Sequence, residues 1–172
     1  MPDVFSKKKR SEVMSRIRSR GNKETEVALA RLLRANGIWG WRRHLLLSVR
    51  SSRGDEAQTK NRQSKFLNRE GVGASSRRLL RVRPDFVFAK ARLAVFVDGC
   101  FWHGCPKHGT NPKGNAAFWL KKISGNQARD LLVNRALRRA NWRVLRIWEH
   151  ELARKYQGRC MARIVKGLEA KL

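Results

Sequence analysis

The chain is short of acidic residues and of long apolar stretches, and each shortage removes a class of protein. Only 13 Asp and Glu residues stand against 40 Lys and Arg residues, which gives a formal net charge of +27. So large an excess destabilises a compact chain unless a polyanion neutralises it, and nucleic acid is the usual polyanion. No apolar run approaches the length of a membrane span, so we expect no membrane association. Charge alone fits a structural RNA binder of the ribosomal kind equally well.

Cysteine is also scarce, because the 172 residues include only three, an odd number. No apolar stretch follows the basic cluster at residues 7–10, so we expect no secretory leader. The expected compartment is therefore the reducing cytoplasm, close to the bacterial nucleoid. Cysteines that lie near histidines in such a compartment are better interpreted as metal ligands than as disulfide partners.

The spacing of apolar residues divides the chain into a basic arm over residues 1–20 and one domain over residues 21–172. In order, the domain is predicted to contain a helix over 23–36, capped by Asn22 and stopped at Gly37, a strand over 38–47, a basic segment of little regular structure over 48–80, strands over 83–88 and 92–97, a helix beginning near 118, a helix over 128–140, a strand over 142–148 and a last helix from 150. This order favours an α/β fold with a mixed central sheet flanked by helices.

Residues 98–108 read Asp-Gly-Cys-Phe-Trp-His-Gly-Cys-Pro-Lys-His and carry the densest chemistry in the chain. Cys100 and Cys105 are separated by four residues, and His108 follows after two more. Thiolates and an imidazole at this spacing fit three ligands of a tetrahedral zinc ion. The alternative is that the thiols are small buried apolar groups.

A fourth zinc ligand has to come from elsewhere. His150 is the first candidate because it follows a predicted strand that could lie beside this loop, and Cys160 and His103 are the competitors. With four protein ligands the zinc would be structural and would tie down a loop that has little core of its own.

Acidic residues follow or precede the two strands predicted before this loop. Asp85 lies at the start of the first strand, and Asp98 ends the second. A hairpin would bring the two ends together, and carboxylate oxygens suit Mg²⁺, which can stabilise charge on a scissile phosphate. His103 lies on the adjoining loop and could accept a proton from attacking water. Taken alone, a Pro-Asp pair is a weak signal, since acids after proline are common in turns.

An ordered series of motifs resembles the very-short-patch repair (Vsr) DNA mismatch endonucleases. The series comprises Arg83-Pro-Asp-Phe86, Val97-Asp-Gly-Cys-Phe-Trp-His103, Phe118-Trp-Leu-Lys-Lys-Ile123, Asn126, Arg129-Asp130 and Trp142-Arg-Val-Leu-Arg-Ile-Trp-Glu149, with Arg10, Ser11, Met14, Ile17 and Glu26 ahead of them. The resemblance covers roughly residues 8–47 and 81–152. It implies a restriction-endonuclease-like fold with a zinc-stapled loop. It also implies a monomer that uses Mg²⁺ to nick double-stranded DNA beside the T of a T:G mismatch, with mismatch-repair proteins as possible partners.

The resemblance also implies roles for individual residues. Asp85 would be the central Mg²⁺ ligand, Val97 would offer its backbone carbonyl, His103 would be the general base, and Glu26 would hold a water of the metal. Asp98 occupies a position that can be histidine in the family, so it is a further candidate for catalysis. The structural zinc site would be formed by Cys100, Cys105, His108 and His150, with histidines at two positions where the best-known member has cysteines.

Aromatic and basic residues supply candidate DNA contacts. Phe101 and Trp102 are consecutive, so on an extended loop they are not expected to enter one core, and Trp119 stands at the start of a separate helix. Apolar wedges of this kind can enter a base stack, and a mismatched step opens at the lowest cost. Further contacts are assigned to Lys121, Lys122, Asn126 and Arg129. The alternative is that these aromatic side chains pack in the core like ordinary apolar residues.

Two other functions fit parts of the sequence. One is a related nuclease of a defence or mobile-element system that acts on another DNA structure, which the long basic segment favours. The other is a zinc-containing nucleic-acid binder without catalysis, which explains the charge and the cysteines but not Asp85 together with His103.

Overall fold

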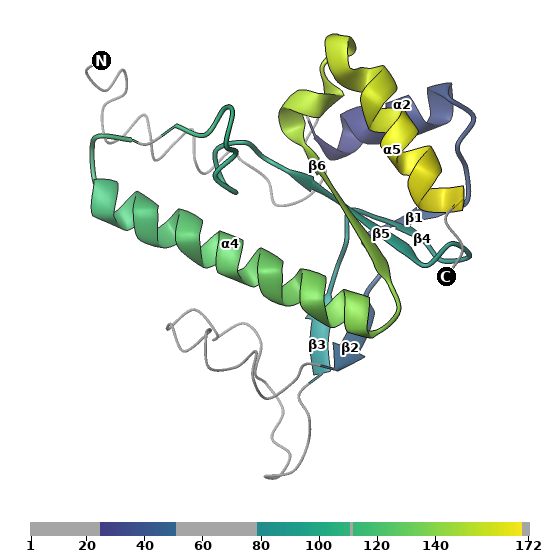
Figure 1. Ribbon diagram of the computed structural model, residues 1–172, viewed down its shortest axis with the longest axis horizontal. Coiled ribbons are helices and arrows are strands. Elements are labelled where there is room, and N and C mark those ends of the chain that lie inside the picture. Colours follow the sequence, from purple (N-terminus) through teal and green to yellow (C-terminus); the bar gives the residue numbers. More distant parts are fainter. Residues whose placement is uncertain (1–24, 51–78, 111, 170–172) are drawn as a thin grey trace.

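The computed structural model describes residues 25–50, 79–110 and 112–169 (Figure 1). Asn22, the basic arm predicted over residues 1–20 and residues 51–78 of the predicted basic segment lie outside the described residues. The helices and strands are α2 (Glu26–Ala35), β1 (Trp41–Arg43), β2 (Leu47–Arg50), β3 (Leu79–Val82), β4 (Phe86–Phe88), β5 (Leu93–Asp98), α4 (Ala116–Arg139), β6 (Arg143–Trp148), the 3-10 turns η2 (Glu149–Leu152) and η3 (Arg154–Tyr156), and α5 (Gln157–Glu169).

Four strands form a mixed sheet in the order β1-β4-β5-β6, which confirms the α/β class predicted from the sequence. The pairs β1–β4 and β4–β5 are antiparallel, whereas β5 and β6 are parallel. The predicted hairpin of two β-rich runs corresponds to β4 and β5, which are joined by a turn in which Arg92 has a φ of 45°. A separate antiparallel pair consists of β2 and β3.

Helices cover both faces of the sheet (Figure 1). One face packs against α2 and α5 around a core that contains Phe86, Val95 and Ile147. The other face packs against α4 and the β2–β3 pair, through residues that include Val87 and Ala94. Side chains alternate between faces along a strand, so neighbouring residues of β4 and β5 contribute to different cores. Even α4, with 24 residues, lacks an apolar stretch that could cross a bilayer, and so do the other described helices.

The parallel pairing of β5 and β6 brings the segments that follow these two strands together at one end of the sheet. The connection between these strands runs through α4, and their register places Asp98 opposite Trp148. Parallel strands end at the same side of a sheet, so the loop that follows β5 and the η2 turn that follows β6 are neighbours. The segments around residues 99–108 and 149–150, far apart in sequence, thus come together.

The strand predicted over residues 38–47 is wrong as a single element. Residues 41–43 pair with β4 in the large sheet, whereas residues 47–50 pair with β3 in the small one. Between them His44 has a φ of 51°, which no extended strand accommodates. The predicted irregular segment over 48–80 is also too long, because residues 48–50 and 79–80 lie in paired strands.

The helices also differ from the prediction at several ends. The helix expected over 23–36 is described as Glu26–Ala35, and Gly37, with a φ of 67°, follows its end as expected. One uninterrupted helix, α4, replaces the two predicted near 118 and over 128–140. The last helix begins at Gln157 rather than at His150, because residues 149–156 form two 3-10 turns.

Candidate active site and metal-ligand cluster

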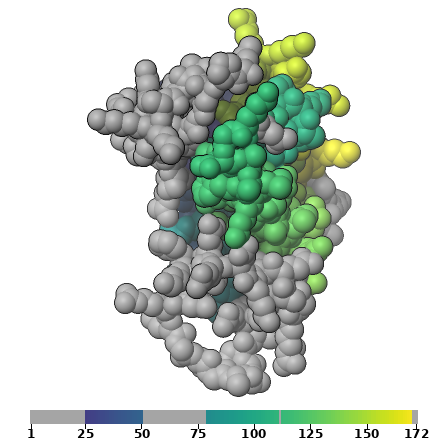
Figure 2. Space-filling view, turned by 90° about the vertical axis from the view of Figure 1, so that its left-hand side faces the viewer, coloured from purple at the N-terminus to yellow at the C-terminus, as the bar shows by residue number. Residues whose placement is uncertain are grey.

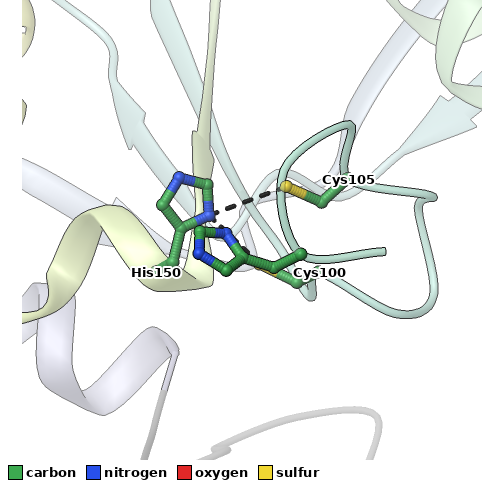
Figure 3. Close-up of side chains that lie close together, drawn as sticks. Cys100, Cys105 and His150 are labelled. Atoms are coloured by element: carbon green, nitrogen blue, oxygen red, sulfur yellow. Dashed lines mark hydrogen bonds between the residues drawn. The ribbon is translucent and has the colours of Figure 1, made fainter. Parts of the chain in front are cut away.

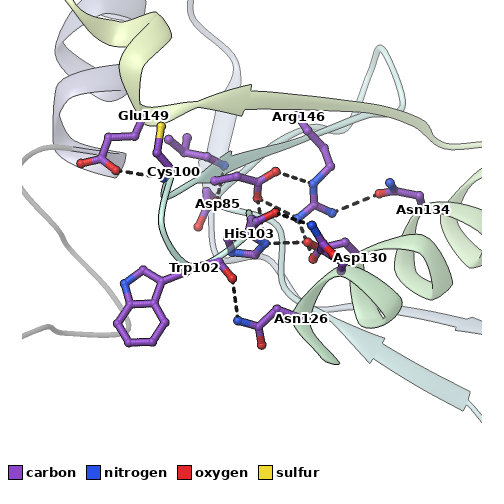
Figure 4. Close-up of polar contacts among 12 residues, drawn as sticks. Asp85, Cys100, Trp102, His103, Asn126, Asp130, Asn134, Arg146 and Glu149 are labelled. Atoms are coloured by element: carbon purple, nitrogen blue, oxygen red, sulfur yellow. Dashed lines mark hydrogen bonds and ion pairs between the residues drawn. The ribbon is translucent and has the colours of Figure 1, made fainter. Parts of the chain in front are cut away.

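Two groups of polar side chains lie at the end of the sheet where β5 stops and β4 begins. Figure 4 shows Asp85 of the first group and His103, Asp130 and Arg146 of the second. The first group consists of Glu26, His44 and Asp85, whose ligand atoms all lie within 4.8 Å of one another. The Oε2 atom of Glu26 is 2.9 Å from Nε2 of His44 and 2.5 Å from a guanidinium nitrogen of Arg43. Two carboxylates and an imidazole at one point can hold a divalent cation.

Asp85 is the carboxylate in this group whose electrostatics are most perturbed. Its Oδ2 atom accepts a hydrogen bond of 2.7 Å from the backbone N–H of Val97 in β5. Burial nevertheless raises the pKa of Asp85 to about 6, and the negative charges of Glu26 and Asp98 add to the rise. A carboxylate that is buried among other carboxylates is stabilised in its charged form by a cation, so the site has the electrostatics of a cation site.

The second group connects His103 to two acids and an arginine. The Nδ1 atom of His103 is 2.5 Å from Oδ2 of Asp130 and 3.8 Å from Oδ1 of Asp98. Arg146 contacts both oxygens of Asp98, at 2.6 and 2.7 Å, and Oδ1 of Asp130 at 2.8 Å. Asp98 is therefore neutralised by a paired guanidinium, and the first group and this one share the end of β5.

The contact with Asp130 assigns the histidine tautomer. Ionised Asp130 accepts a hydrogen bond, so the Nδ1 atom of His103 carries the proton. The Nε2 atom of a neutral imidazole is then the acceptor. An imidazole oriented by a carboxylate on one side and free to accept a proton on the other has the arrangement of a general base.

Four ligand-type side chains gather at the start of η2 and in the loop after β5 (Figure 3). They are Cys100, Cys105, His108 and His150, and their ligand atoms lie within 4.8 Å of one another. The Nδ1 atom of His150 is 3.2 Å from Sγ of Cys100 and 3.7 Å from Sγ of Cys105. Tetrahedral zinc with its usual bond lengths separates sulfur and nitrogen ligands by about 3.5 Å, so the donor set and its spacing fit zinc.

The two competing candidates for the fourth ligand lie outside this group. His103 is bonded to Asp130. Cys160 lies on the buried face of α5, in the core, and burial raises the pKa of its thiol to about 11, as expected of an unligated buried cysteine. Burial and the charge of His108 lower the pKa of His150, which favours the neutral imidazole that a metal requires.

Helix α4 and η2 hold the loop between β5 and α4 from both sides. Asn126 donates a hydrogen bond of 2.8 Å to the carbonyl of Trp102, and Gln127 donates one of 3.2 Å to the carbonyl of His103. Glu149 accepts a bond of 3.1 Å from the backbone N–H of Cys100. Three of the four members of the metal-ligand cluster and the candidate base are thus carried by one loop that α4 and η2 hold in place.

The aromatic side chains of the loop and of the start of α4 form one cluster. The ring centroid of Phe101 is 5.2 Å from those of Trp102 and Trp119, and Phe118 packs edge-on against Trp119 at the same distance. Phe101 and Trp102 belong to neither buried core cluster, as expected, although their loop is turned rather than extended: the N–H of His103 donates to the carbonyl of Gly99. Trp119 is buried at 9% exposure, whereas Phe101 and Trp102 are half-buried.

The polar residues assigned to DNA contacts fall into two kinds. Lys121 and Arg129 are exposed on α4, and Lys122 is half-buried there. Asn126 instead bonds to the backbone of the loop before the helix. Figure 2 views the side on which α4 begins, and the first part of this helix lies at the surface there.

Sequence reasoning missed three residues of the site. His44 lies beside Glu26 and Asp85, Asp130 holds His103, and Arg146 connects the two acids of the second group. Asp130 and Arg146 both belonged to recognised motifs, but nothing assigned either of them a role. His44 carried no signal, because a single histidine next to arginines is unremarkable in so basic a chain.

Comparison with known proteins confirms the resemblance that the motifs indicated. Residues 42–108 match the family model of the DNA mismatch endonuclease Vsr. The matched segment contains Asp85, Val97, His103 and three members of the metal-ligand cluster.

Several curated proteins are similar to this chain over a comparable length. The type II nicking enzyme V.NaeI of Lentzea aerocolonigenes is 50% identical over 86 residues, which is 50% of this chain and 48% of that protein. The type II nicking enzyme V.XorIIP of Xanthomonas oryzae is 46% identical over 72 residues, or 41% and 52% of the two chains. The DNA mismatch endonuclease Vsr of Escherichia coli is 42% identical over 69 residues, or 39% and 44%. The matched part spans about half the length of these relatives.

Proposed function

We propose, from the resemblance to Vsr and the chemistry of the site, that this chain is a Mg²⁺-dependent endonuclease that nicks one DNA strand beside the T of a T:G mismatch. Such mismatches arise when 5-methylcytosine deaminates, and the nick would begin very-short-patch repair. The fold would be restriction-endonuclease-like. The observation that carries the proposal is that the Glu26–His44–Asp85 group and His103, bonded to Asp130, lie at the same end of β5.

The carboxylates of Asp85 and Glu26, with the backbone carbonyl of Val97, would hold the cation. When bound, Mg²⁺ supplies positive charge that stabilises the scissile phosphate and the leaving oxygen. His44 borders the same space, and its Nε2 atom bonds to Glu26, so it would keep that carboxylate directed at the site.

His103 would supply the base. Its Nδ1–H donates to Asp130, so Nε2 would accept a proton from the water that attacks phosphorus. Oδ1 of Asp98 is 3.8 Å from Nδ1 of His103, and the Asp98 carboxylate is paired with Arg146. Asp98 would therefore support the base from a buried position. The charge that develops on the imidazole would be stabilised by Asp130.

DNA would be held mostly by charge. The formal net charge of +27 and the exposed Lys121 and Arg129 on α4 support phosphate contacts that are independent of sequence. The half-buried Phe101 and Trp102, supported from beneath by the buried Trp119, would form a wedge that enters the base stack at the mismatch. We propose that the chain acts as a monomer.

A strand-specific nicking assay tests the function. A duplex with one T:G mismatch, labelled separately on each strand, is incubated with the chain and Mg²⁺ beside matched T:A and C:G duplexes. We expect one labelled product, from the T strand of the mismatched duplex only. Asp85→Ala and His103→Ala should abolish it, while Glu169→Ala, which removes an exposed acid on α5 far from the site, should leave it unchanged.

The same assay separates the second candidate function. Relatives of this chain are named both nicking enzymes and a mismatch endonuclease, which keeps a related nuclease with another DNA target in consideration. Cleavage of branched, nicked or differently mismatched DNA without cleavage at T:G would select that candidate. Binding without cleavage of any of these substrates would indicate a nucleic-acid binder.

A further inference from the structure

We propose that Arg146 is a positioning residue that holds His103 in its working orientation through Asp130. The proposal rests on the proposed nuclease function, in which His103 takes the proton from water. Arg146 itself lies in β6, and its hydrogen bonds and ion pairs go to Asp98, Asp130 and Asn134. Its influence passes through the carboxylate that the two side chains share.

The guanidinium of Arg146 joins three elements (Figure 4). Its Nε and Nη2 atoms grip both oxygens of Asp98 at the end of β5, at 2.6 and 2.7 Å. Its Nη2 atom also lies 2.8 Å from Oδ1 of Asp130, and Nη1 donates over 3.2 Å to Oδ1 of Asn134 one turn further along α4. Each of the three guanidinium nitrogens therefore has an oxygen partner.

The two oxygens of Asp130 are divided between two partners. Oδ1 faces Arg146 and Oδ2 faces Nδ1 of His103. A carboxylate with a single bonded oxygen can rotate about its side-chain torsion, whereas one that is held at both oxygens has a fixed plane. Because the plane of Asp130 is fixed by Arg146, the direction in which the imidazole donates is fixed as well.

Burial and charge make Arg146 difficult to replace. The Asp98 side chain is 5% exposed, and Asp130 and Arg146 are each 21% exposed. Burial lowers the pKa of Arg146, but the bond to Asp98 and the charges of Asp98 and Asp130 raise it more, so the guanidinium is a permanent cation here. Lysine would keep the charge but has a single nitrogen, which cannot span both oxygens of Asp98 and also reach Asp130.

The first test measures the histidine itself and needs no DNA. Zinc-loaded chain is labelled with ¹⁵N in histidine, and the ring nitrogens of His103 are assigned by comparison with His103→Gln. In wild type at pH 8 we expect a single tautomer with the proton on Nδ1. Arg146→Met should give a mixture of both tautomers. An unchanged tautomer in Arg146→Met would overturn the proposal whether or not the chain nicks DNA.

Loss of the arginine alone removes the guanidinium partner of Asp98 and leaves Asp130 with His103, so a second variant separates positioning from folding. Asp98→Asn combined with Arg146→Met removes one charge of each sign and so restores the formal charge that the group has in wild type. We expect this double variant to recover the melting temperature lost in Arg146→Met while the tautomer mixture persists. Recovery of the single tautomer together with the melting temperature would show that Arg146 is merely structural. Arg163→Met is the matched control and should leave the tautomer unchanged. It removes the ion pair between Arg163 and Glu151 and the hydrogen bond from Arg163 to a backbone carbonyl of β6.

Nicking kinetics supply the last arm. Arg146→Met/Asp98→Asn should lower kcat on the order of 100-fold with little change in KM, the size expected when a reacting group is slightly misplaced. Asp130→Asn should lower kcat similarly, and adding the Arg146 change to it should have no further effect, because both act through one carboxylate. Independent, multiplying losses would contradict the proposed route. If wild type nicks no substrate, the proposed function fails, and the tautomer measurement still decides the positioning role.

Discussion

The backbone N–H of Val97 donates a 2.7 Å hydrogen bond to Oδ2 of Asp85, across the point where the β4–β5 pairing ends. This bond lowers the pKa of the carboxyl group, yet burial outweighs it and raises the pKa to about 6. The Asp85 carboxylate is therefore held in place by the backbone of β5 and is at the same time poorly solvated.

The raised pKa of Asp85 predicts a pH-dependent stability in metal-free protein. The native state binds this proton more tightly than the unfolded chain does, so its stabilisation is complete below about pH 3.8 and disappears as the pH rises through about 6. Asp85→Asn keeps an acceptor for Val97 without a charge. In EDTA we expect the variant to exceed wild type at pH 7.5 by up to about 3 kcal/mol in free energy of unfolding. Denaturant melts at pH 4.5 and 7.5 measure it, and an equal difference at both values would refute the assignment.

The metal-ligand cluster formed by Cys100, Cys105, His108 and His150 predicts which substitutions preserve bound zinc. His150→Cys keeps a zinc ligand and should retain about one zinc per chain, whereas His150→Ala should lose it. Loss should lower the melting temperature by roughly 10 °C, equivalent to about 3 kcal/mol in a domain of this size. Cys160→Ala is the control, since its thiol lies in the core away from this cluster. Metal analysis measures the bound zinc, and thermal melts measure the stability. Wild-type chain purified without zinc would contradict the proposed zinc site.

The aromatic cluster predicts different results for its half-buried and buried members. Trp102→Ala should weaken binding to a T:G duplex far more than to a matched duplex, because only the mismatched step opens readily. Trp119→Ala should also destabilise the fold by about 3 kcal/mol, since this ring is 9% exposed. Fluorescence anisotropy and denaturant melts distinguish the two. Equal losses of affinity on both duplexes for Trp102→Ala would assign it to folding.

Gly104 predicts how tightly the loop is fitted against α4. Its φ is +62°, and an added Cβ atom would lie 2.6 Å from Nε2 of Gln127 and 3.0 Å from Cγ2 of Ile123. Gly104→Ala should therefore cost about 1–2 kcal/mol and slow nicking, because His103 precedes it. Gly125→Ala is the matched control: it lies within α4 with nothing near its Cβ position and should stabilise the chain by about 1 kcal/mol. Thermal melts compare the two, and a neutral Gly104→Ala would mean that the loop is loosely held.

The parts of the fold that the sequence predicted correctly are those with local chemical signals. Alternating β-rich residues identified β4 and β5, and Gly37 marked the end of α2. The break at His44 was missed because a positive φ at a non-glycine residue leaves no trace in a hydrophobic pattern. Ser124 and Gly125 lower helix propensity enough to suggest two helices, yet α4 continues through them.

The candidate site shows the same division. The metal-ligand cluster was found from spacing because three of its members lie within nine positions. His150, which follows β6, joins them as expected. Asp130 and Arg146 were not found, because their roles arise only when β5, β6 and α4 are assembled. Both belong to motifs of the resemblance, but neither motif indicates that Asp130 of α4 meets Arg146 of β6.

The in-register alignment of Asp98 with Trp148 has a consequence for how the protein becomes competent. One sliding error of two residues between these strands would carry Glu149 and His150 away from the cysteines and pull Arg146 off both of its carboxylates in the same movement. The proposed zinc site and the proposed base would thus both depend on one shared alignment. Binding of a zinc ion would then favour the same strand register that places Arg146 between its two carboxylates.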